Sequence, residues 1–334
     1  MRPAEGGGGR PRGRWSRVSR AKDRVVRPTP EQLASLTRLE RASFEIADFL
    51  ARPELSVLSK AWNSAFMGGL IYSCGGRRFN IRGLEHLAPF GKKDSVLLVA
   101  NHRSFFDFFS ISAILYWRTQ LTKRIFFPVR QNFFYDNPVG PLVNGIMSGM
   151  RMFPPVMRDK EKRAFNNYVV ARCIDELNRD DIGTVLGIHP EGTRNKGSDP
   201  YSFLPAQPGV GRIALGATRA YVIPVFALGM GQSIFGEMKV NALAPNDHPV
   251  DMYFGAPIDF TDLRPKANMV TTQKRAADRC LDGIKALAER QRRDAAIRAG
   301  RDPDADVPVS ERPVARPGTP PNTSERSAQS SADA

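Results

Sequence analysis

Two segments near the start of the chain have apolar residues at helical spacing. A capping-box pattern at residues 29–32, with proline in the first turn, precedes spaced apolar residues up to Leu50. A second apolar segment runs from Leu55 to Tyr72 and presents Trp62 and Phe66 for an interface. The pattern predicts two helices before residue 77.

From residue 78 onward, short apolar runs alternate with helical patterns. Strands are expected at 78–82, 95–100, 125–129, 152–157, 184–188, 221–228, 239–243 and 250–254. Helices are expected at 104–117, 138–150, 160–178, 210–219 and 272–297. This alternation predicts an α/β fold, a layered mixed β-sheet flanked by helices, with its site at the ends of strands.

Composition separates this body from two tails. The first 30 residues hold nine Lys or Arg against two acids and almost no apolar residues, and the end of the chain is rich in Pro, Ser and Asp. We expect a disordered basic tail over 1–29, a helical region over 30–76 as a candidate membrane interface, a main domain over 77–297 and a disordered tail over 298–334.

Charge and cysteine content narrow the class of protein. A net charge of +15 favours anionic partners such as phospholipid headgroups, phosphorylated substrates or nucleic acid. Cys74, Cys173 and Cys280 form no C-x-x-C pair, which fits a reducing cytoplasm, and we interpret the last two as small buried hydrophobic residues. No apolar stretch reaches the roughly 18 residues of a membrane span.

The strongest local signal is His102 followed by Asp107, where a buried run enters a turn and then a helix. A histidine held by a carboxylate is a general base. On one helix the two side chains would lie about 140° apart, so they meet only if His102 precedes the helix, for which Ser104 is a candidate N-cap. The alternative is structural, with Asp107 capping the helix.

A second motif, residues 190–194, also follows a strand and offers groups that suit an anion. Glu191, Gly192, Thr193 and Arg194 supply an acid, a flexible backbone, a hydroxyl and a guanidinium. The alternative is a surface turn stabilised by a Glu–Arg pair.

Arg158 also follows a strand-like run, although it begins a charged segment typical of a solvated helix start. The sequence has no G-x-S-x-G elbow, Walker A loop, H-E-x-x-H motif or clustered Cys and His ligands. We therefore expect no metal.

Together these motifs resemble the glycerophospholipid acyltransferase family. The resemblance rests on Asn101, His102 and Asp107, then Arg158, then residues 190–194, and it covers roughly residues 77–257. It is most similar to the 1-acylglycerol-3-phosphate acyltransferases. The sequence departs from the family pattern at His189, where an aromatic residue is usual, and at Met157, where an acid often stands.

The resemblance implies a role for each motif residue. His102 is then the general base and Asp107 orients it, while Arg158, Glu191, Gly192, Thr193 and Arg194 bind the acceptor's phosphate. Residues 77–297 become the acyltransferase domain. No cofactor is implied beyond the acyl donor, which is acyl-CoA or acyl carrier protein.

The implied reaction esterifies a lysophospholipid or glycerol phosphate, foremost 1-acylglycerol-3-phosphate to give phosphatidate, on the cytoplasmic face of the membrane. Glycerol-3-phosphate or dihydroxyacetone-phosphate acyl transfer is the alternative, since the block around His102 also resembles those enzymes. A non-catalytic basic protein of a lipid surface or nucleic acid is the alternative of another class. We expect no nucleic-acid partner, because the basic tail lacks aromatic residues apart from Trp15.

Overall fold

The computed structural model describes residues 26–122, 124–131, 134–135, 137–149 and 151–303. These fall into two compact units, one ending at Leu287 and one beginning at Ala288. The described part of the second unit contains the end of helix α10 (Val270–Arg298). The expected tails lie largely outside the described residues.

A six-stranded sheet forms the centre of the first unit. Its order is β1-β8-β7-β2-β6-β3, and the strands are β1 (Phe79–Arg82), β2 (Ser95–Ala100), β3 (Ile125–Phe126), β6 (Val185–Ile188), β7 (Ala220–Leu228) and β8 (Val250–Phe254). All neighbours pair in parallel except β7 and β8, which pair antiparallel. A separate parallel pair consists of β4 (Val129–Arg130) and β5 (Pro155–Val156). The predicted mixed sheet is confirmed.

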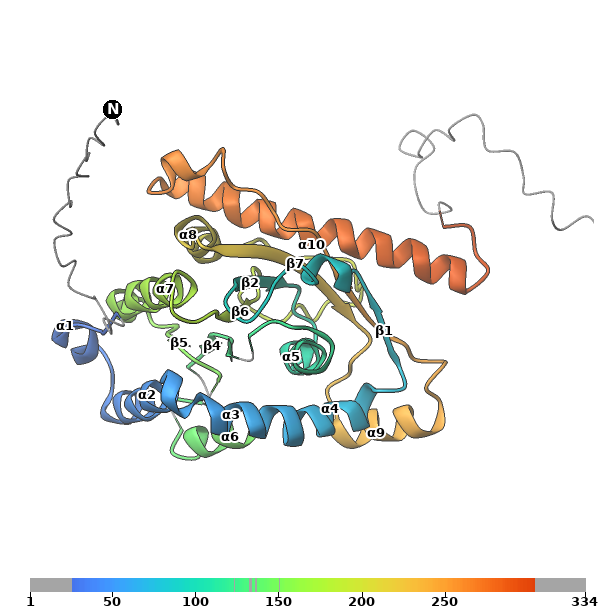
Figure 1. Cartoon of the computed structure of the whole chain (residues 1–334), viewed down its shortest axis with the longest axis horizontal. Coiled ribbons are helices and arrows are strands. Elements are labelled where there is room, and N and C mark those ends of the chain that lie inside the picture. The colour runs from blue at the N-terminus through green and yellow to red at the C-terminus, as the bar shows by residue number, and fades with distance from the viewer. Residues whose placement is uncertain (1–25, 123, 132–133, 136, 150, 304–334) are drawn as a thin grey trace, which may run out of the picture. The chain divides into compact units, whose positions relative to one another are not determined.

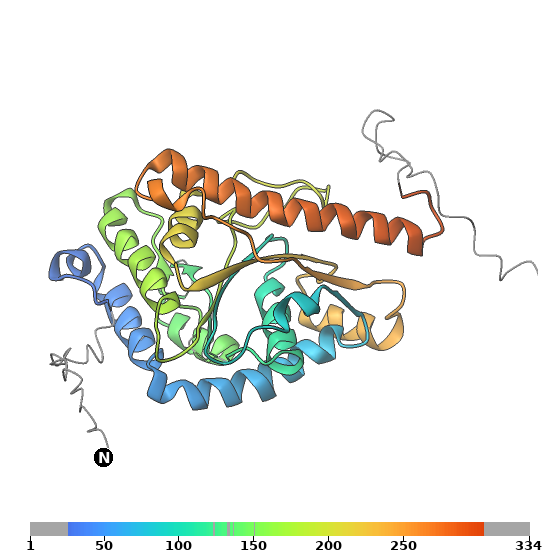
Figure 2. The same ribbon diagram turned by 45° about the horizontal axis from the view of Figure 1, so that its top comes forward.

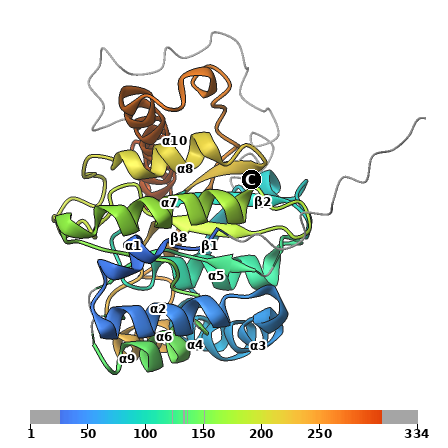
Figure 3. The ribbon, with the colours of Figure 1, turned by 90° about the vertical axis from the view of Figure 1, so that its left-hand side faces the viewer.

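Helices cover both faces of this sheet. The main ones are α5 (Asp107–Arg118), α7 (Arg163–Leu177) and α8 (Pro208–Gly216). Figures 1 and 3 show α7 and α8 on one face and α5 on the other, and Figure 2 shows the strands lying between them. Every residue of β2 is buried, as its uninterrupted apolar sequence requires for a central parallel strand.

Five further helices form a layer beyond α5. They are α2 (Arg38–Leu50), α3 (Ser56–Trp62), α4 (Gly68–Gly75), α6 (Gly140–Ser148) and α9 (Ile234–Leu243). A π-helical turn, Asn63–Met67, joins α3 to α4. The helix expected from Leu55 to Tyr72 is therefore present with an irregular centre.

The sequence-based prediction was wrong at four places. The expected strand 125–129 is divided into β3, in the six-stranded sheet, and β4, in the separate pair. The expected strand 239–243 is the second half of α9, which begins after Ser233, whose hydroxyl accepts from the Gly236 amide. The first expected helix is divided into α1 (Pro30–Ala34) and α2, because Thr37 and Glu40 form a second capping box. Ser104 is not the N-cap of α5, which begins at Asp107.

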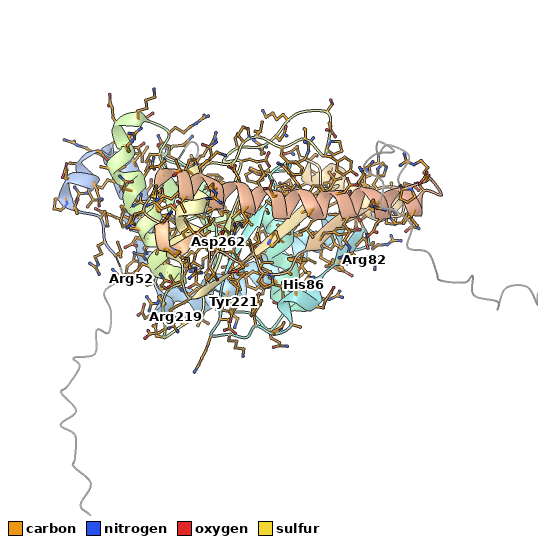
Figure 4. The ribbon with its side chains drawn as sticks, turned by 90° about the horizontal axis from the view of Figure 1, so that it is seen from above. Arg52, Arg82, His86, Arg219, Tyr221 and Asp262 are labelled. Carbon is orange, nitrogen blue, oxygen red and sulfur yellow. The ribbon has the colours of Figure 1, made fainter. Side chains whose placement is uncertain are left out.

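No helix among the described residues combines the length and the apolar character needed to cross a bilayer. The three cysteines are free and buried, as expected for Cys173 and Cys280. A cavity of about 540 Å³ opens at the amino end of β7, where Arg219 and Tyr221 lie next to each other (Figure 4).

Candidate active site

The carboxyl end of β2 delivers His102 into a tight turn before α5. Asn101 fixes this turn to β7, because its amide nitrogen donates to the Ala227 carbonyl and its amide oxygen accepts from the Ala227 amide, both at 2.8 Å. Asn101 is buried, so each polar atom of its side chain needs such a partner. The turn that carries His102 is therefore held by the sheet itself.

Asp107 lies across the turn from His102, and the predicted contact between them is present. Its Oδ2 is 3.1 Å from His102 Nδ1. The same oxygen accepts from the backbone amides of Arg103 and Ser104 at 2.8 and 2.9 Å. Asp107 thus holds the turn closed and contacts the imidazole at once. The alternative in which Asp107 caps the helix is not what the structure shows, because Asp107 is the first residue of α5, whose N-cap position is Phe106 without a side-chain hydrogen bond.

His189, at the end of β6, lies flat against His102. The ring centroids are 3.7 Å apart and the planes differ by 4°. His189 Nδ1 is 3.0 Å from the Ala100 carbonyl, and Phe108 packs against the same ring. The sequence marked His189 only as a departure from the family pattern and gave no sign that it supports His102.

Burial sets the protonation states of these groups. Burial lowers the pKa of His102 to about 4, with Arg194 and Arg130 adding to the shift. Burial and the neighbouring His102 lower the pKa of His189 to about 3. Burial raises the pKa of Asp107 to about 6, although His189 and the amides of Ser104 and Arg103 oppose the rise.

At neutral pH both imidazoles are therefore neutral and Asp107 is ionised. An ionised carboxylate accepts from the Nδ1 proton of His102, which places the lone pair of the ring on Nε2. This tautomer, inferred from the hydrogen bonds, is the one that a general base requires.

Glu191 ties the second motif to the first. Its carboxylate accepts from the His102 amide at 3.1 Å and from the Leu204 amide at 2.9 Å, and its side chain is buried. The Asn195 amide donates to the His102 carbonyl at 2.8 Å. Glu191 is thus engaged with the backbone and holds the loop 191–194 beside His102. The alternative of a surface turn built on a Glu–Arg pair is not what these contacts show.

Gly192 occupies the sharpest point of that loop. Its φ of +65° is in the left-handed region, which favours glycine over residues with a side chain. Its amide donates to the His189 carbonyl at 2.9 Å. Thr193 and Arg194 follow and line the same cavity as His102.

Three arginines border this cavity. Arg158 and Arg194 were predicted, whereas Arg130 was missed. Pairing of β4 with β5 places Arg130 opposite Val156, two residues before Arg158. Burial and the nearby Arg158 lower the pKa of Arg130. The sequence signal for Arg130 was its position directly after the expected strand 125–129.

The cavity itself has a volume of about 900 Å³. One part of its wall is polar, with His102 and the three arginines. Much of the remaining wall is apolar and comes from α5, β6, α7, α8 and several loops, including Phe105, Phe109, Phe127, Phe134, Met152, Val169, Val170, Ile188, Val210 and Ile213. Such a cavity fits a ligand with an anionic head and a hydrocarbon tail.

His102, Asp107 and His189 are also the one group of possible metal ligands among the described residues, with ligand atoms within 4.8 Å of one another. The two imidazole planes are parallel, so their in-plane lone pairs do not converge on one point. His102 Nδ1 is engaged with Asp107. This geometry favours a proton-transfer pair over a metal centre.

Comparison with known proteins gives a match to one family model over part of the chain. Residues 78–227 match the family model described as Acyltransferase. No curated protein matches the chain. The matched segment contains the turn at His102, the loop at 191–194 and most of β7. It supports acyl transfer by an enzyme as the general activity of this chain.

Proposed function

We propose that this protein transfers a fatty acyl group from a thioester, acyl-CoA or acyl carrier protein, to the hydroxyl of a lysophospholipid or glycerol phosphate. The foremost acceptor is 1-acylglycerol-3-phosphate, which gives phosphatidate. The observation that carries the proposal is that a neutral His102, in contact with Asp107, lines a cavity together with three arginines and many apolar side chains.

His102 removes the proton of the acceptor hydroxyl while the oxygen attacks the thioester carbonyl. The tetrahedral intermediate then collapses, the carbon–sulfur bond breaks, and the proton passes from His102 to the leaving thiolate. The histidine ends in its starting state, and no covalent acyl-enzyme is needed because the thioester is already activated.

The arginines supply the affinity for the acceptor's phosphate. A guanidinium binds a phosphate with paired charge-assisted hydrogen bonds, and Arg130, Arg158 and Arg194 all border the cavity. Glu191 and Gly192 shape the loop that carries Thr193 and Arg194, so their contribution to phosphate binding is through position.

The test is a panel of donors and acceptors with the purified full chain, in which thiol release is followed and the lipid product is identified by mass spectrometry. We expect turnover with 1-acylglycerol-3-phosphate and no effect of a chelator, since no cofactor takes part. Exclusive turnover with glycerol-3-phosphate or dihydroxyacetone phosphate would establish the alternative acceptor. Lack of transfer with every pair, together with a salt-sensitive shift of nucleic acid, would overturn the proposal.

We also propose that the protein acts at the cytoplasmic face of a membrane, as a peripheral or monotopic protein. The apolar chain from Leu55 to Tyr72 supports this, because it exposes Trp62 and Phe66, whose rings stack at 4.5 Å. Free buried cysteines fit the reducing side of the membrane.

A further inference from the structure

Helices from three separate parts of the chain expose large apolar side chains in one layer. The layer contains the α3–α4 segment, α6 and α9, which lie together in Figures 1 and 3. Its most exposed apolar residues are Leu58, Phe235 and Leu243, at 74%, 84% and 73%. The others are Val57, Trp62, Phe66, Tyr72, Val139, Leu142, Ile146 and Met238.

Hydrogen bonds hold these helices in fixed positions. Trp62 Nε1 donates to the Ile146 carbonyl at 2.8 Å, which joins α3 to α6. On the other side, Asn241 of α9 accepts from the Arg77 amide and donates to the Ser73 carbonyl, both at 3.0 Å. The exposed residues therefore belong to one supported surface.

The polarity of α6 and α9 is inverted relative to helices on an aqueous surface. In α6, Asn144 and Ser148 are buried, while Leu142 and Ile146 are exposed. In α9 the buried residue is Asn241, and the exposed positions hold Phe235, Met238 and Leu243 beside the single charged residue Lys239. A helix that turns its polar side to the protein and its apolar side outward fits a hydrocarbon environment.

Charge favours an anionic lipid surface over a second copy of this chain. Within residues 56–76 and 139–149 the only charged residue is Lys60. Helix α9 adds Lys239, and its Glu237 is paired with Arg78 at 2.6 Å. Cations thus border the apolar surface without unpaired acids in these segments, so two copies facing each other would bring like charges together, whereas anionic headgroups would complement them.

We propose that α6 and α9, together with α3–α4, form a single bilayer-binding face for anionic phospholipid, in which α9 is an independent anchor. The inference rests on the proposed function only in that the acceptor is a membrane lipid, since binding to the bilayer needs no turnover. It predicts that membrane attachment survives loss of any one aromatic side chain of the α3–α4 segment.

The test is flotation of the full chain with vesicles of phosphatidylcholine and phosphatidylglycerol. The variants are Phe235→Glu with Leu243→Glu on α9, and Leu142→Glu with Ile146→Glu on α6. Val270→Glu is the matched control, because Val270 is 70% exposed on α10 and lies outside the layer. Salt at about 0.5 M reduces the contribution of the basic first residues.

We expect each double variant to weaken vesicle binding by at least about tenfold, since two exposed apolar side chains that enter the bilayer in the proposed binding mode are replaced by charges. We expect the control to bind as the parent does. Parental binding by the α9 variant would overturn the proposal. The proposal would also be overturned if the parent chain did not bind vesicles but sedimented as a dimer, and if these substitutions dissociated that dimer. His102→Ala should keep full vesicle binding, which separates failure of this inference from failure of acyl transfer.

Discussion

At the scale of single residues, the proposed chemistry depends on how His102, Asp107 and His189 divide their protons. One oxygen of Asp107, Oδ2, accepts hydrogen bonds from three donors: His102 Nδ1 and the backbone amides of Arg103 and Ser104. His189 covers one side of the His102 ring. In the proposed mechanism, this arrangement leaves one basic nitrogen, His102 Nε2, for the acceptor hydroxyl.

Removing the base should abolish transfer. A positioned general base contributes about 10² to 10⁴ in rate, so His102→Ala should lose at least that factor in kcat, and Asp107→Asn should lose almost as much because the tautomer is no longer fixed. Thiol release by purified variants measures the loss, with the thermal unfolding midpoint confirming the fold. Near-normal turnover of His102→Ala would refute the mechanism.

The pH dependence follows from Asp107. The pKa of Asp107 is raised to about 6, so its carboxylate forms as pH rises through that value. His102 has a pKa lowered to about 4 and is therefore mostly neutral over the same pH range. We expect kcat/KM to fall about tenfold per pH unit below pH 6 and to be level above it. The Asp107→Asn variant should not show this fall in kcat/KM below pH 6. If the fall persists in Asp107→Asn, a group other than Asp107 causes it.

The arginines should affect binding of the acceptor more than the chemical step. Arg130→Ala or Arg194→Ala should raise the acceptor KM roughly tenfold to hundredfold with little change in kcat, since a charge-assisted hydrogen bond to the phosphate is lost. Arg163→Ala is the matched control, because Arg163 is exposed outside the cavity. An unchanged acceptor KM in both variants would show that the phosphate lies elsewhere.

The sequence indicated the reacting pair but not its supports. His102 and Asp107 are close along the chain, so local spacing was enough to predict their contact. Arg130 and His189 reach the site through strand pairing across the fold, which one sequence does not reveal. Glu191 lines the cavity that contains His102, yet its two backbone contacts depend on a loop geometry that no motif specifies.

At the scale of elements, β6 and α5 must approach closely for Asp107 to reach His102. Gly187 of β6 faces the ring of Phe108, and a side chain at 187 would clash with that ring. Phe108 is buried and packs against His189, so it cannot move aside without disturbing the site. The glycine is therefore a condition for the spacing between sheet and helix.

Gly187→Ala should lower both the thermal midpoint and kcat, because α5 and with it Asp107 are displaced. Overpacking of this kind costs about 1 to 3 kcal/mol of unfolding free energy. Gly69→Ala is the matched control, since a Cβ there meets no atom within 4 Å. Denaturant unfolding and thiol release measure the two effects. Equal behaviour of the two variants would show that the contact is unimportant.

Element prediction failed where short apolar runs were ambiguous. Residues 239–243 contain alternating apolar positions that suit a strand, but the capping hydroxyl of Ser233 begins a helix earlier in the chain. The buried strands β2 and β8 were predicted with correct bounds. In β2 the uninterrupted apolar run from Val96 to Ala100 leaves fewer options. At residues 239–243, the local helix cap at Ser233 therefore decided the secondary structure more than the apolar pattern did.

At the scale of the whole molecule, the proposed function and the proposed bilayer-binding face assign different parts of the fold to the same lipid. Under these proposals the cavity recognises one lipid through its headgroup and chain, while the layer of α3–α4, α6 and α9 holds the enzyme where such lipids are concentrated. Binding to a surface raises the effective concentration of acceptor without any change in the cavity. The two contributions are therefore separable in kinetics.

The Phe235→Glu, Leu243→Glu variant should show this separation. With an acceptor embedded in vesicles, its apparent KM should rise about tenfold or more, because the variant spends less time at the surface. With a short-chain acceptor dissolved as monomers, KM and kcat should match those of the parent, since neither residue lines the cavity. Initial rates of thiol release for both acceptors measure the ratio. If both acceptors lose activity equally, α9 acts on the cavity itself, and the division between membrane binding and catalysis fails.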